Sequence, residues 1–409
     1  MIMIIIYNYL NMILIYKAWV LLVFLTIATF VHATPSNEEI MQMVLELKKE
    51  IAELKKENKA LKGDVENVVV ATDEAMKSQI KLINKSSFGG YAELHGNWLE
   101  DQKGSSDKDQ MDLHRFVLSF NHTYSDKLRL VSELEIEHSV AGDDQVGEVE
   151  IERAYIEYDV TDNSSLVAGL FILPIGILNE THEPSTFYGV ERNNVEKNII
   201  PTTWWEGGVM LSTNIMDGLN VKLAGHSALQ SSATFKPRDG RQKVGEANSE
   251  SFAYTASAKY SAIPGLTLGA SINFQEDFSN GSGLAADDAL LYEVHLDYER
   301  DAFRLKSLYA SWDIKGSGPK ALGRDEQFGF YIEPSYKFND NFGVFARYSQ
   351  WDNEAGQDAS DTEYTQTDYG INWWLDPQVV VKVDYQTQSV GSGITQEMNG
   401  INVGMGYAF

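Results

Sequence analysis

Alternation of apolar and polar residues is the main pattern of the second part of the chain. In its last segment, Ile401, Val403, Met405, Tyr407 and Phe409 share one parity, and small or polar residues stand between them. A period of two is typical of a β-strand with two unlike faces. An apolar face that runs to Phe409 predicts that the last strand pairs with the first one, as in a closed transmembrane barrel.

The same alternation predicts sixteen strands between residues 90 and 409, for example 112–124, 265–274 and 379–387. Short turns rich in Asp, Asn, Ser and Pro alternate with long polar loops along this region. This pattern favours an all-β, antiparallel outer-membrane barrel over residues 87–409, with short turns in the periplasm and long loops outside. A soluble β-sandwich or β-helix is the alternative, but it does not require such alternation. Sixteen strands would leave an aqueous channel inside.

Residues 34–86 show a heptad pattern instead, which predicts a periplasmic coiled coil and linker. In a parallel pair, the acidic g positions face the basic e positions of a partner helix, so we expect a parallel homo-oligomer. A single amphipathic helix lying on its own barrel is the alternative. The a and d residue types favour two strands, whereas cyclic symmetry also permits three. The e positions are Lys48, Lys55 and Lys62, the g positions are Glu50, Glu57 and Asp64, and Asn58 is at a core a position.

Residues 1–33 are almost entirely apolar, and Lys17 is their one charged residue. Residues 31–33 resemble the small-x-small site at which a signal peptide is cleaved. We therefore expect a cleaved signal peptide, with translation starting at Met1 or Met12, and an uncleaved membrane anchor is the alternative. After residue 33, no stretch approaches the roughly 20 apolar residues of a membrane helix.

Composition excludes some partners. The 409 residues include 59 acidic and 33 basic ones, which gives a net charge of −26, and most of the acidic excess falls after residue 86. Such a charge argues against nucleic acid as a partner. Mean hydropathy is only −0.27, as expected when each strand has one apolar face. The 20 Tyr, 18 Phe and 8 Trp residues are consistent with aromatic belts at two membrane interfaces.

The gap from 173 to 203 is the longest between predicted strands. A loop of this length is usually functional, and in a wide barrel it can fold inward and constrict the lumen. A loop folded over the mouth of the barrel is the alternative. The candidate constriction residues are Glu180, His182, Glu183, Glu191, Arg192, Glu196 and Lys197.

At the strand positions that the alternation predicts to face the lumen, acidic and basic residues are nearly equal in number. Rings of one charge sign select ions, and acidic loops concentrate cations. The balance predicts a pore that is weakly selective or mildly cation-preferring. The pore-lining candidates are Arg115, Arg129, Arg153, Glu133, Glu135, Lys222, Glu293, Arg304, Lys306, Glu333, Arg347, Asp368 and Lys382.

Three stretches resemble the phosphate-selective porin O/P family: 167–176, the triplet 190–192, and 201–209, with 153–158 just upstream. The resemblance covers roughly residues 88–409. It implies a sixteen-stranded trimeric porin whose constriction loop follows an apolar-Pro-x-Gly step, preceded in several members by a coiled coil. It also implies phosphate or anion selectivity, although the inward charges form no basic ladder. The terminal strand with Tyr407 and Phe409 resembles the signal read by the barrel-assembly machinery.

Other chemistry has little support in the sequence. The eight His residues form no HExxH motif or paired metal spacing, and no GxSxG motif occurs, so we expect no enzyme and no cofactor. Calcium bridging to lipopolysaccharide at acidic loops is a minor alternative. The remaining function classes are a porin for small solutes or ions, located in the outer membrane of a Gram-negative bacterium, and a tether between that membrane and the cell wall. The acidic loop residues are Asp143, Asp144, Asp287, Asp288, Asp358 and Asp361.

Overall fold

The computed structural model describes residues 36–409 apart from 84 and 358. The chain divides into two compact units, Met1–Lys81 and Leu82–Phe409, and each is described by itself. The predicted signal peptide over 1–33 lies outside the described residues.

Helix α2 (Asn37–Ile83) covers the segment with the heptad pattern. Its first turn has a capping box, because the Glu39 amide donates to Ser36 Oγ at 3.3 Å and the Ser36 amide donates to Glu39 Oε2 at 2.9 Å. The predicted core residues Ile51 and Leu54 are 50% and 47% exposed in the single chain. The association of this helix with a second copy stays a prediction. Among the described helices, none has both the length and the apolar character needed to cross a bilayer.

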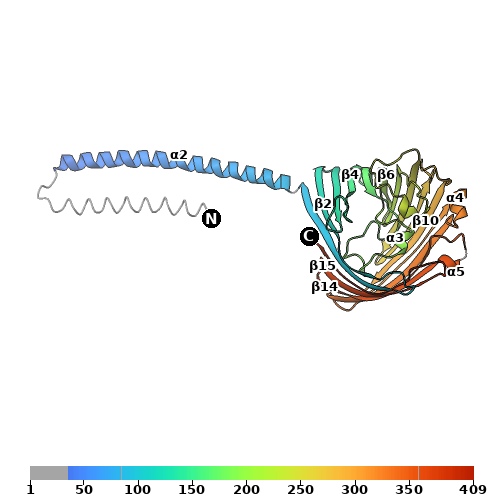
Figure 1. The fold of residues 1–409 in the computed structure, drawn as a ribbon. Helices are drawn as coiled ribbons and strands as arrows, with labels where there is room; N and C mark the ends of the chain where they lie inside the picture. The colour runs from blue at the N-terminus through green and yellow to red at the C-terminus, as the bar shows by residue number, and fades with distance from the viewer. Residues whose placement is uncertain (1–35, 84, 358) are drawn as a thin grey trace. The chain divides into compact units, whose positions relative to one another are not determined.

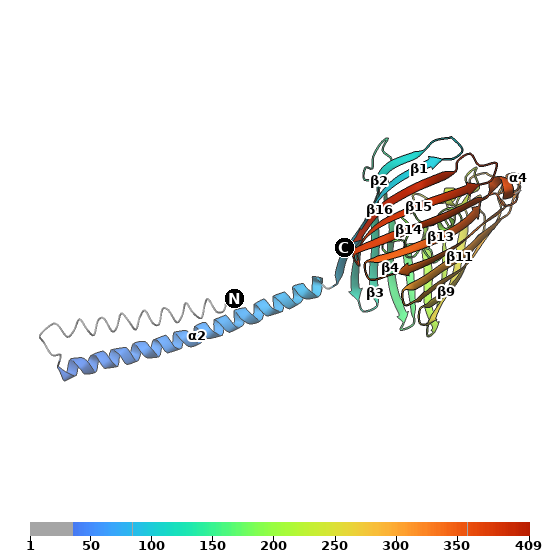
Figure 2. The ribbon, with the colours of Figure 1, turned by 90° about the horizontal axis from the view of Figure 1, so that it is seen from below.

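The described part of the second unit forms a closed antiparallel barrel of sixteen strands (Figures 1 and 2), which confirms the predicted barrel. Each strand pairs with its neighbours in sequence, and β1 pairs with β16. The strands are β1 (Ser86–Asp101), β2 (Lys108–Ser125), β3 (Leu128–Glu137), β4 (Val149–Thr161), β5 (Ser164–Ile172), β6 (Trp205–Met216), β7 (Leu219–Ser227), β8 (Phe252–Ile263), β9 (Leu266–Gln275), β10 (Ala289–Arg300), β11 (Phe303–Ile314), β12 (Glu326–Lys337), β13 (Phe342–Asp352), β14 (Tyr364–Asp376), β15 (Val379–Val390) and β16 (Met398–Ala408).

The barrel closes at the end of the chain, as the terminal alternation predicts. Tyr91 faces Ala408 across the β1–β16 seam. Beyond the strand, the Phe409 amide donates to the Gly90 carbonyl at 2.9 Å, and the Gly90 amide donates to the Phe409 carbonyl at 3.1 Å. The last residue is therefore held in the ladder.

The two faces of each strand differ as the period of two requires. On β9, for example, Ile272 and Phe274 are exposed on the outside, whereas Asn273 and Gln275 are buried inside. Apolar side chains outside and polar side chains inside are the arrangement expected of a barrel in a bilayer.

Besides the register shifts next to the short turns, two β-bulges interrupt this alternation within strand pairs that line the cavity. Between β1 and β2 the register shifts after Glu93, which leaves His114 without a partner residue. Between β3 and β4 it shifts after Glu133, which leaves Glu152 without one. A bulge adds one residue to a strand and redirects the side chains around it. Glu152 is buried inside the barrel as a result, and His114 lines the interior cavity described below.

Short and long connections alternate around the barrel, as the sequence predicts. Among the long ones, the connection 173–204, here called the inner loop, contains α3 (Val195–Asn198) and lies inside the barrel (Figure 1). The loop contacts β11 and β15 inside the barrel, and its role as a constriction stays a prediction. The other short helices are η2 (Pro237–Gly240), α4 (Ser317–Ala321) and α5 (Ala359–Thr362).

The inner loop packs against one side of the lumen through an apolar core. Ile175, Ile199 and Trp204 of the loop are fully buried in a cluster with Leu308 and Trp312 of β11. The Trp312 indole also donates to the Ile199 carbonyl at 2.8 Å. The apolar cluster includes residues of β5–β7 and β10–β13, whereas a polar space remains on the side of β1–β4.

Candidate functional site

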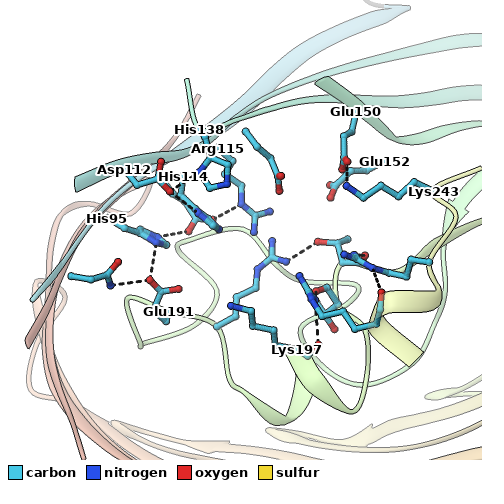
Figure 3. Close-up of a pocket in the computed structure, with 18 of the residues that line it drawn as sticks. His95, Asp112, His114, Arg115, His138, Glu150, Glu152, Glu191, Lys197 and Lys243 are labelled. Atoms are coloured by element: carbon cyan, nitrogen blue, oxygen red, sulfur yellow. Dashed lines mark hydrogen bonds and ion pairs between the residues drawn. The ribbon is translucent and has the colours of Figure 1, made fainter. Parts of the chain in front are cut away.

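A cavity of about 320 Å³ separates the inner loop from strands β1–β4 (Figure 3). Charged and polar side chains dominate its lining. One side of the cavity is the barrel wall, and the other side consists of the inner loop and the 228–251 loop that contains η2. The site is therefore a charged cavity beside an apolar core.

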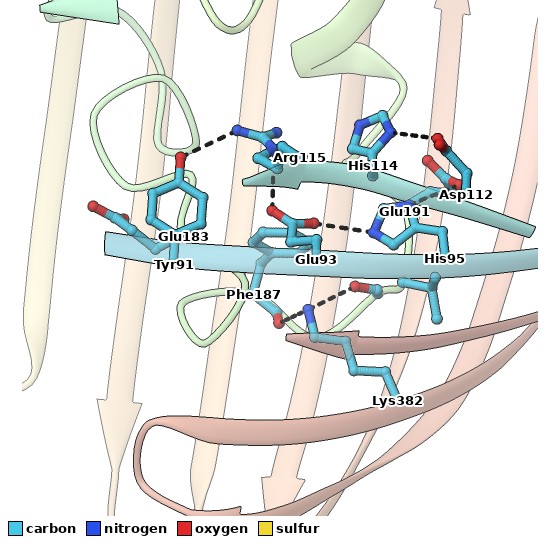
Figure 4. Close-up of polar contacts among 12 residues, drawn as sticks. Tyr91, Glu93, His95, Asp112, His114, Arg115, Glu183, Phe187, Glu191 and Lys382 are labelled. Atoms are coloured by element: carbon cyan, nitrogen blue, oxygen red, sulfur yellow. Dashed lines mark hydrogen bonds and ion pairs between the residues drawn. The ribbon is translucent and has the colours of Figure 1, made fainter. Parts of the chain in front are cut away.

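On the barrel wall, Arg115 of β2 is enclosed by acceptors (Figure 4). Its Nε lies 3.2 Å from Glu93 Oε1 and 3.5 Å from Glu135 Oε1, and its Nη1 donates to the Tyr91 hydroxyl at 3.2 Å. All four side chains are buried. A buried charge needs such partners because removal from water is costly.

His95 connects the wall to the inner loop. Its Nε2 lies 3.0 Å from Glu93 Oε2, and its Nδ1 lies 3.4 Å from Glu191 Oε1. Asn97, two residues along β1, donates to the same Glu191 carboxylate at 3.0 Å. Glu191, predicted as a constriction residue, therefore contacts the wall of the barrel.

The opposite side of the cavity is basic. Arg238 Nη1 donates to the Thr202 carbonyl at 2.7 Å, and Arg241 Nη1 donates to the Thr203 carbonyl at 2.5 Å. Arg192 Nη1 donates to Thr203 Oγ1 at 2.7 Å, while its Nε and Nη2 have no hydrogen-bond partner among the described residues.

These guanidinium groups have no ion pair with a carboxylate in the part of the chain that the structure describes. Burial and the neighbouring Arg241 lower the pKa of Arg238 to about 10, so this group keeps its charge at neutral pH. Lys197 of the inner loop lines the same side (Figure 3). On the loop side, Arg192, Lys197, Arg238 and Arg241 thus have no carboxylate ion pair among the described residues, whereas Lys243 pairs with Glu148 and Glu150.

One acidic side chain, that of Glu180, attaches the first half of the inner loop to the barrel wall. Glu180 contacts the ammonium groups of Lys222 on β7 and Lys259 on β8. Burial raises the pKa of Glu180, but the two lysines outweigh burial and lower the pKa to about 2. The backbone carbonyl of Glu183 accepts a hydrogen bond from the Thr186 amide at 3.0 Å, within the same loop.

His182 and Glu196 are buried contacts of the same loop. The Nε2 of His182 lies 3.2 Å from Glu152 Oε2, and this carboxylate raises the pKa of His182 although burial lowers it. Glu196 accepts the amides of Ile177 and Leu178 at 2.9 and 2.6 Å and the Tyr331 hydroxyl at 2.8 Å. Burial raises the pKa of Glu196. Both side chains therefore position the loop and do not face the cavity as free charges.

Most pore-lining candidates form ion pairs with neighbouring strands, which matters because a paired charge contributes little to ion selection. The closest pairs are Arg153 with Glu133 at 2.9 Å, Arg129 with Asp159 at 2.7 Å, Arg304 with Asp297 at 2.6 Å, and Arg347 with Glu333 at 3.2 Å and with Asp368 at 3.0 Å. Lys306 and Lys382 donate to inner-loop carbonyls, at 3.0 Å to Thr186 and 2.8 Å to Phe187. Glu293, which contacts His295 at 2.6 Å, lines a second cavity of about 280 Å³ together with Lys222 and Glu180.

The sequence-based reasoning missed several residues of the main cavity. Asp112, His114 and Glu152 stand next to β-bulges, where parity counting fails. His138 follows the end of β3, and Arg238, Arg241 and Lys243 belong to a loop whose inward course no pattern indicates. A basic cluster between strands β7 and β8 was the one available signal.

Three clusters in the described part of the chain combine residues that could hold a metal ion, and all lie on the β1–β4 side. They are Asp112, His114 and His138; Glu133, Glu152 and His182; and Glu135, Glu137 and Glu150. The acidic loop residues Asp143, Asp144, Asp287, Asp288 and Asp361 belong to none of these described clusters, and Asp358 lies outside the described residues.

No family model matches the chain. An uncharacterized protein of Aquifex aeolicus (strain VF5) is 31% identical over 350 residues, which cover 75% of this chain and 77% of that protein. This chain belongs to the same family as the Aquifex protein. The shared region is long enough to include most of the barrel.

Solved outer-membrane channels have a similar fold. The channel DcaP of Acinetobacter baumannii is 14% identical with a TM-score of 0.56, and it aligns over 79% of this chain and 97% of its own. An anion-selective porin from Comamonas acidovorans is 14% identical with a TM-score of 0.55, over 79% and 99% of the two chains. OmpF of Salmonella typhi, in complex with daunomycin, is 16% identical with a TM-score of 0.57, over 79% and 97%. The barrel therefore has a porin fold.

Proposed function

We propose that this protein is an outer-membrane porin through which small hydrophilic solutes or ions diffuse passively. The observation that carries the proposal is the charged cavity between the inner loop and β1–β4, inside a closed barrel of sixteen strands. Barrels of this size leave an aqueous lumen unless something fills it. Here the apolar core fills one side only, and the polar side remains available to water.

The location follows from the same fold. The apolar outer face of the barrel fits the lipid of an outer membrane, and outer-membrane channels have the same architecture. In this proposal the helix precedes the barrel on the periplasmic side, lipopolysaccharide surrounds the long loops, and the barrel-assembly machinery inserts the chain.

For selectivity, we propose a pore that is weakly selective or mildly cation-preferring. The paired charges of the lumen and the acidic excess of the chain support this choice. An anion-selective pore, including one for phosphate as in the porin O/P family, is the second candidate. It is favoured by Arg192, Arg238 and Arg241, whose charges are not neutralised by ion pairs among the described residues.

We further propose that the protein is a homotrimer, held together by the barrels and by parallel association of α2. The exposed apolar side chains of Ile51 and Leu54 support helix association. The same helix suits a tether between the outer membrane and the cell wall, a role that is compatible with diffusion through the barrel.

Conductance measurements test the proposal directly. The purified full-length protein is added to a planar bilayer, and the reversal potential is measured in a KCl gradient before phosphate is titrated. We expect discrete conductance steps, a reversal potential near zero or of cation-preferring sign, and no block by micromolar phosphate. Folded protein without conductance would contradict the porin, whereas strong anion selectivity with phosphate block would favour the second candidate.

A further inference from the structure

Three potential metal ligands converge on the wall of the main cavity. Asp112 and His114 belong to β2, and His138 follows the end of β3. The carboxylate oxygen Oδ2 of Asp112 lies 3.2 Å from Nδ1 of His114 and 2.8 Å from Nδ1 of His138. All three ligand atoms lie within 4.8 Å of one another. The two imidazole side chains are 30% and 31% exposed and line the cavity, so an ion in the passage can reach them.

Two irregularities of the backbone produce this convergence. In a regular strand, alternate residues share a face, so Asp112 and His114 would lie on one face and Arg115 on the other. The β-bulge at His114 lets both His114 and Arg115 face the cavity instead. At His138 the backbone has a φ of 52°, a left-handed conformation that few residues adopt, and the His138 amide donates to the His114 carbonyl at 3.2 Å. This turn places the His138 ring beside Asp112.

The two separations from Asp112 are compatible with shared coordination of a metal ion. Two ligands at about 2.0–2.1 Å from a tetrahedral zinc ion are about 3.3–3.4 Å apart, and at a right angle they are about 2.9 Å apart. The observed distances of 2.8 and 3.2 Å from Asp112 to the two imidazole nitrogens are close to these values. Asp112 can therefore share an ion with either histidine at nearly its present distance, and the three ligand atoms lie within 4.8 Å of one another.

Neighbouring groups support the orientation of the ligands. The His95 ring stacks on His114 with centroids 4.6 Å apart, and His95 is itself held by Glu93 and Glu191 (Figures 3 and 4). Groups that orient metal ligands commonly contribute to metal affinity. Because Glu191 belongs to the inner loop, the cluster is also connected to the element that narrows the passage.

We propose that Asp112, His114 and His138 bind one first-row divalent transition-metal ion, such as Zn²⁺, at the wall of the passage. Imidazole and carboxylate ligands suit these ions, and three protein ligands leave a coordination position open toward the cavity for water or a solute. Binding adds two positive charges to the acidic side of the passage. The proposal does not depend on the porin function, because binding can be measured without a membrane.

Zinc binding to the untagged, full-length protein in detergent, after treatment with a chelator, tests this proposal. We expect saturable binding of one Zn²⁺ per chain in equilibrium dialysis. The double variant H114Q/H138Q should lose at least about tenfold in affinity, since it removes two of three ligands. H122Q is the matched control, because His122 lies on the same strand but contacts Ser86 near the short turns, and its affinity should equal that of the wild type.

A spectroscopic measurement complements the dialysis. Co²⁺ bound to the wild type should give visible absorption bands that excess Zn²⁺ removes, and these bands should be absent from H114Q/H138Q. Heat-dependent gel mobility verifies that each variant is folded, and H138Q alone, altered outside the strands, replaces the double variant if that one does not fold. The proposal is wrong if the folded wild type shows no saturable Zn²⁺ binding, or if the variants bind Zn²⁺ as tightly as H122Q. In that case the two histidines only form hydrogen bonds with Asp112.

Discussion

The ammonium group of Lys382 lies 3.7 Å from the centroid of the Phe187 ring and donates to the Phe187 and Gly189 carbonyls at 2.8 and 2.9 Å (Figure 4). Lys382 stands on β15, and the other two residues belong to the inner loop. One side chain thus fastens the loop to the wall through two hydrogen bonds and a cation–π contact. The position of the inner loop depends on a few such attachments.

The K382M variant should loosen the inner loop. It leaves two buried carbonyls without their donor, which costs about 1–3 kcal/mol in the free energy of unfolding. We expect a lower midpoint in urea and noisier open-channel current. K103M, in the exposed β1–β2 loop, is the control and should behave like the wild type. Equal stability of the two variants would show that Lys382 does not hold the loop.

The G406A variant should disturb the inner loop at a second contact, where Gly406 of β16 faces Pro184 of the loop. A Cβ atom at Gly406 would lie 2.3 Å from Cβ of Pro184, so the loop or β16 must move. Such overpacking costs about 1–3 kcal/mol. The control is G225A, where the nearest side-chain atom would be 3.7 Å away. We expect G406A alone to lower the urea midpoint, and an unchanged midpoint would mean that the loop does not press against β16.

Removal of charge from the basic side of the cavity should shift selectivity toward cations. In water, a unit charge about 8 Å from the ion path contributes roughly 0.5 kcal/mol, or about a twofold change in ion occupancy. R238Q/R241Q should therefore move the reversal potential in the cation-preferring direction. R238K/R241K keeps the charge and should leave the sign and size of the potential nearly unchanged. A similar shift in both variants would assign the effect to lost loop contacts instead of charge.

The attachment of Glu180 should weaken in acid. Its pKa is lowered from 4.5 to about 2 because Lys222 and Lys259 outweigh the effect of burial. A lowered pKa means that the stabilisation is complete above about pH 4.5 and is lost as the pH falls toward 2. The difference in unfolding free energy between wild type and E180Q should therefore be largest near neutral pH and shrink below pH 4.5. A difference that stays constant from pH 7 to pH 3 would exclude this ionic attachment.

Deletion of residues 37–83 should separate the roles of helix and barrel. If the barrel is the channel, single-channel conductance stays the same, while the oligomers seen by crosslinking become less stable without α2. Conductance that disappears from a still-folded barrel would assign the channel to the helical segment. Crosslinking that is unchanged would show that the barrels alone hold the oligomer together.

The sequence predicts the barrel well because alternation, turn chemistry and loop lengths are local properties. It predicts less of the site, since parity counting assumes a regular strand. At His114 and Glu152 an extra residue changes which side chains face inward, and no local pattern marks these bulges. The inward course of Arg238 and Arg241 depends on contacts with Thr202 and Thr203, more than thirty residues earlier in the chain. The charge balance predicted for the lumen from parity does not indicate which charges pair, and many of the candidates form ion pairs across strands.

The strand that closes the barrel also forms part of the passage. Glu93, His95 and Asn97 line the cavity from β1, and Asn97 donates to Asn402 of β16 across the seam at 2.8 Å. Pairing with β16 thus holds in place a strand that lines the cavity. If the barrel conducts ions as proposed, the seam between the first and last strands is also a structural support of the pore wall.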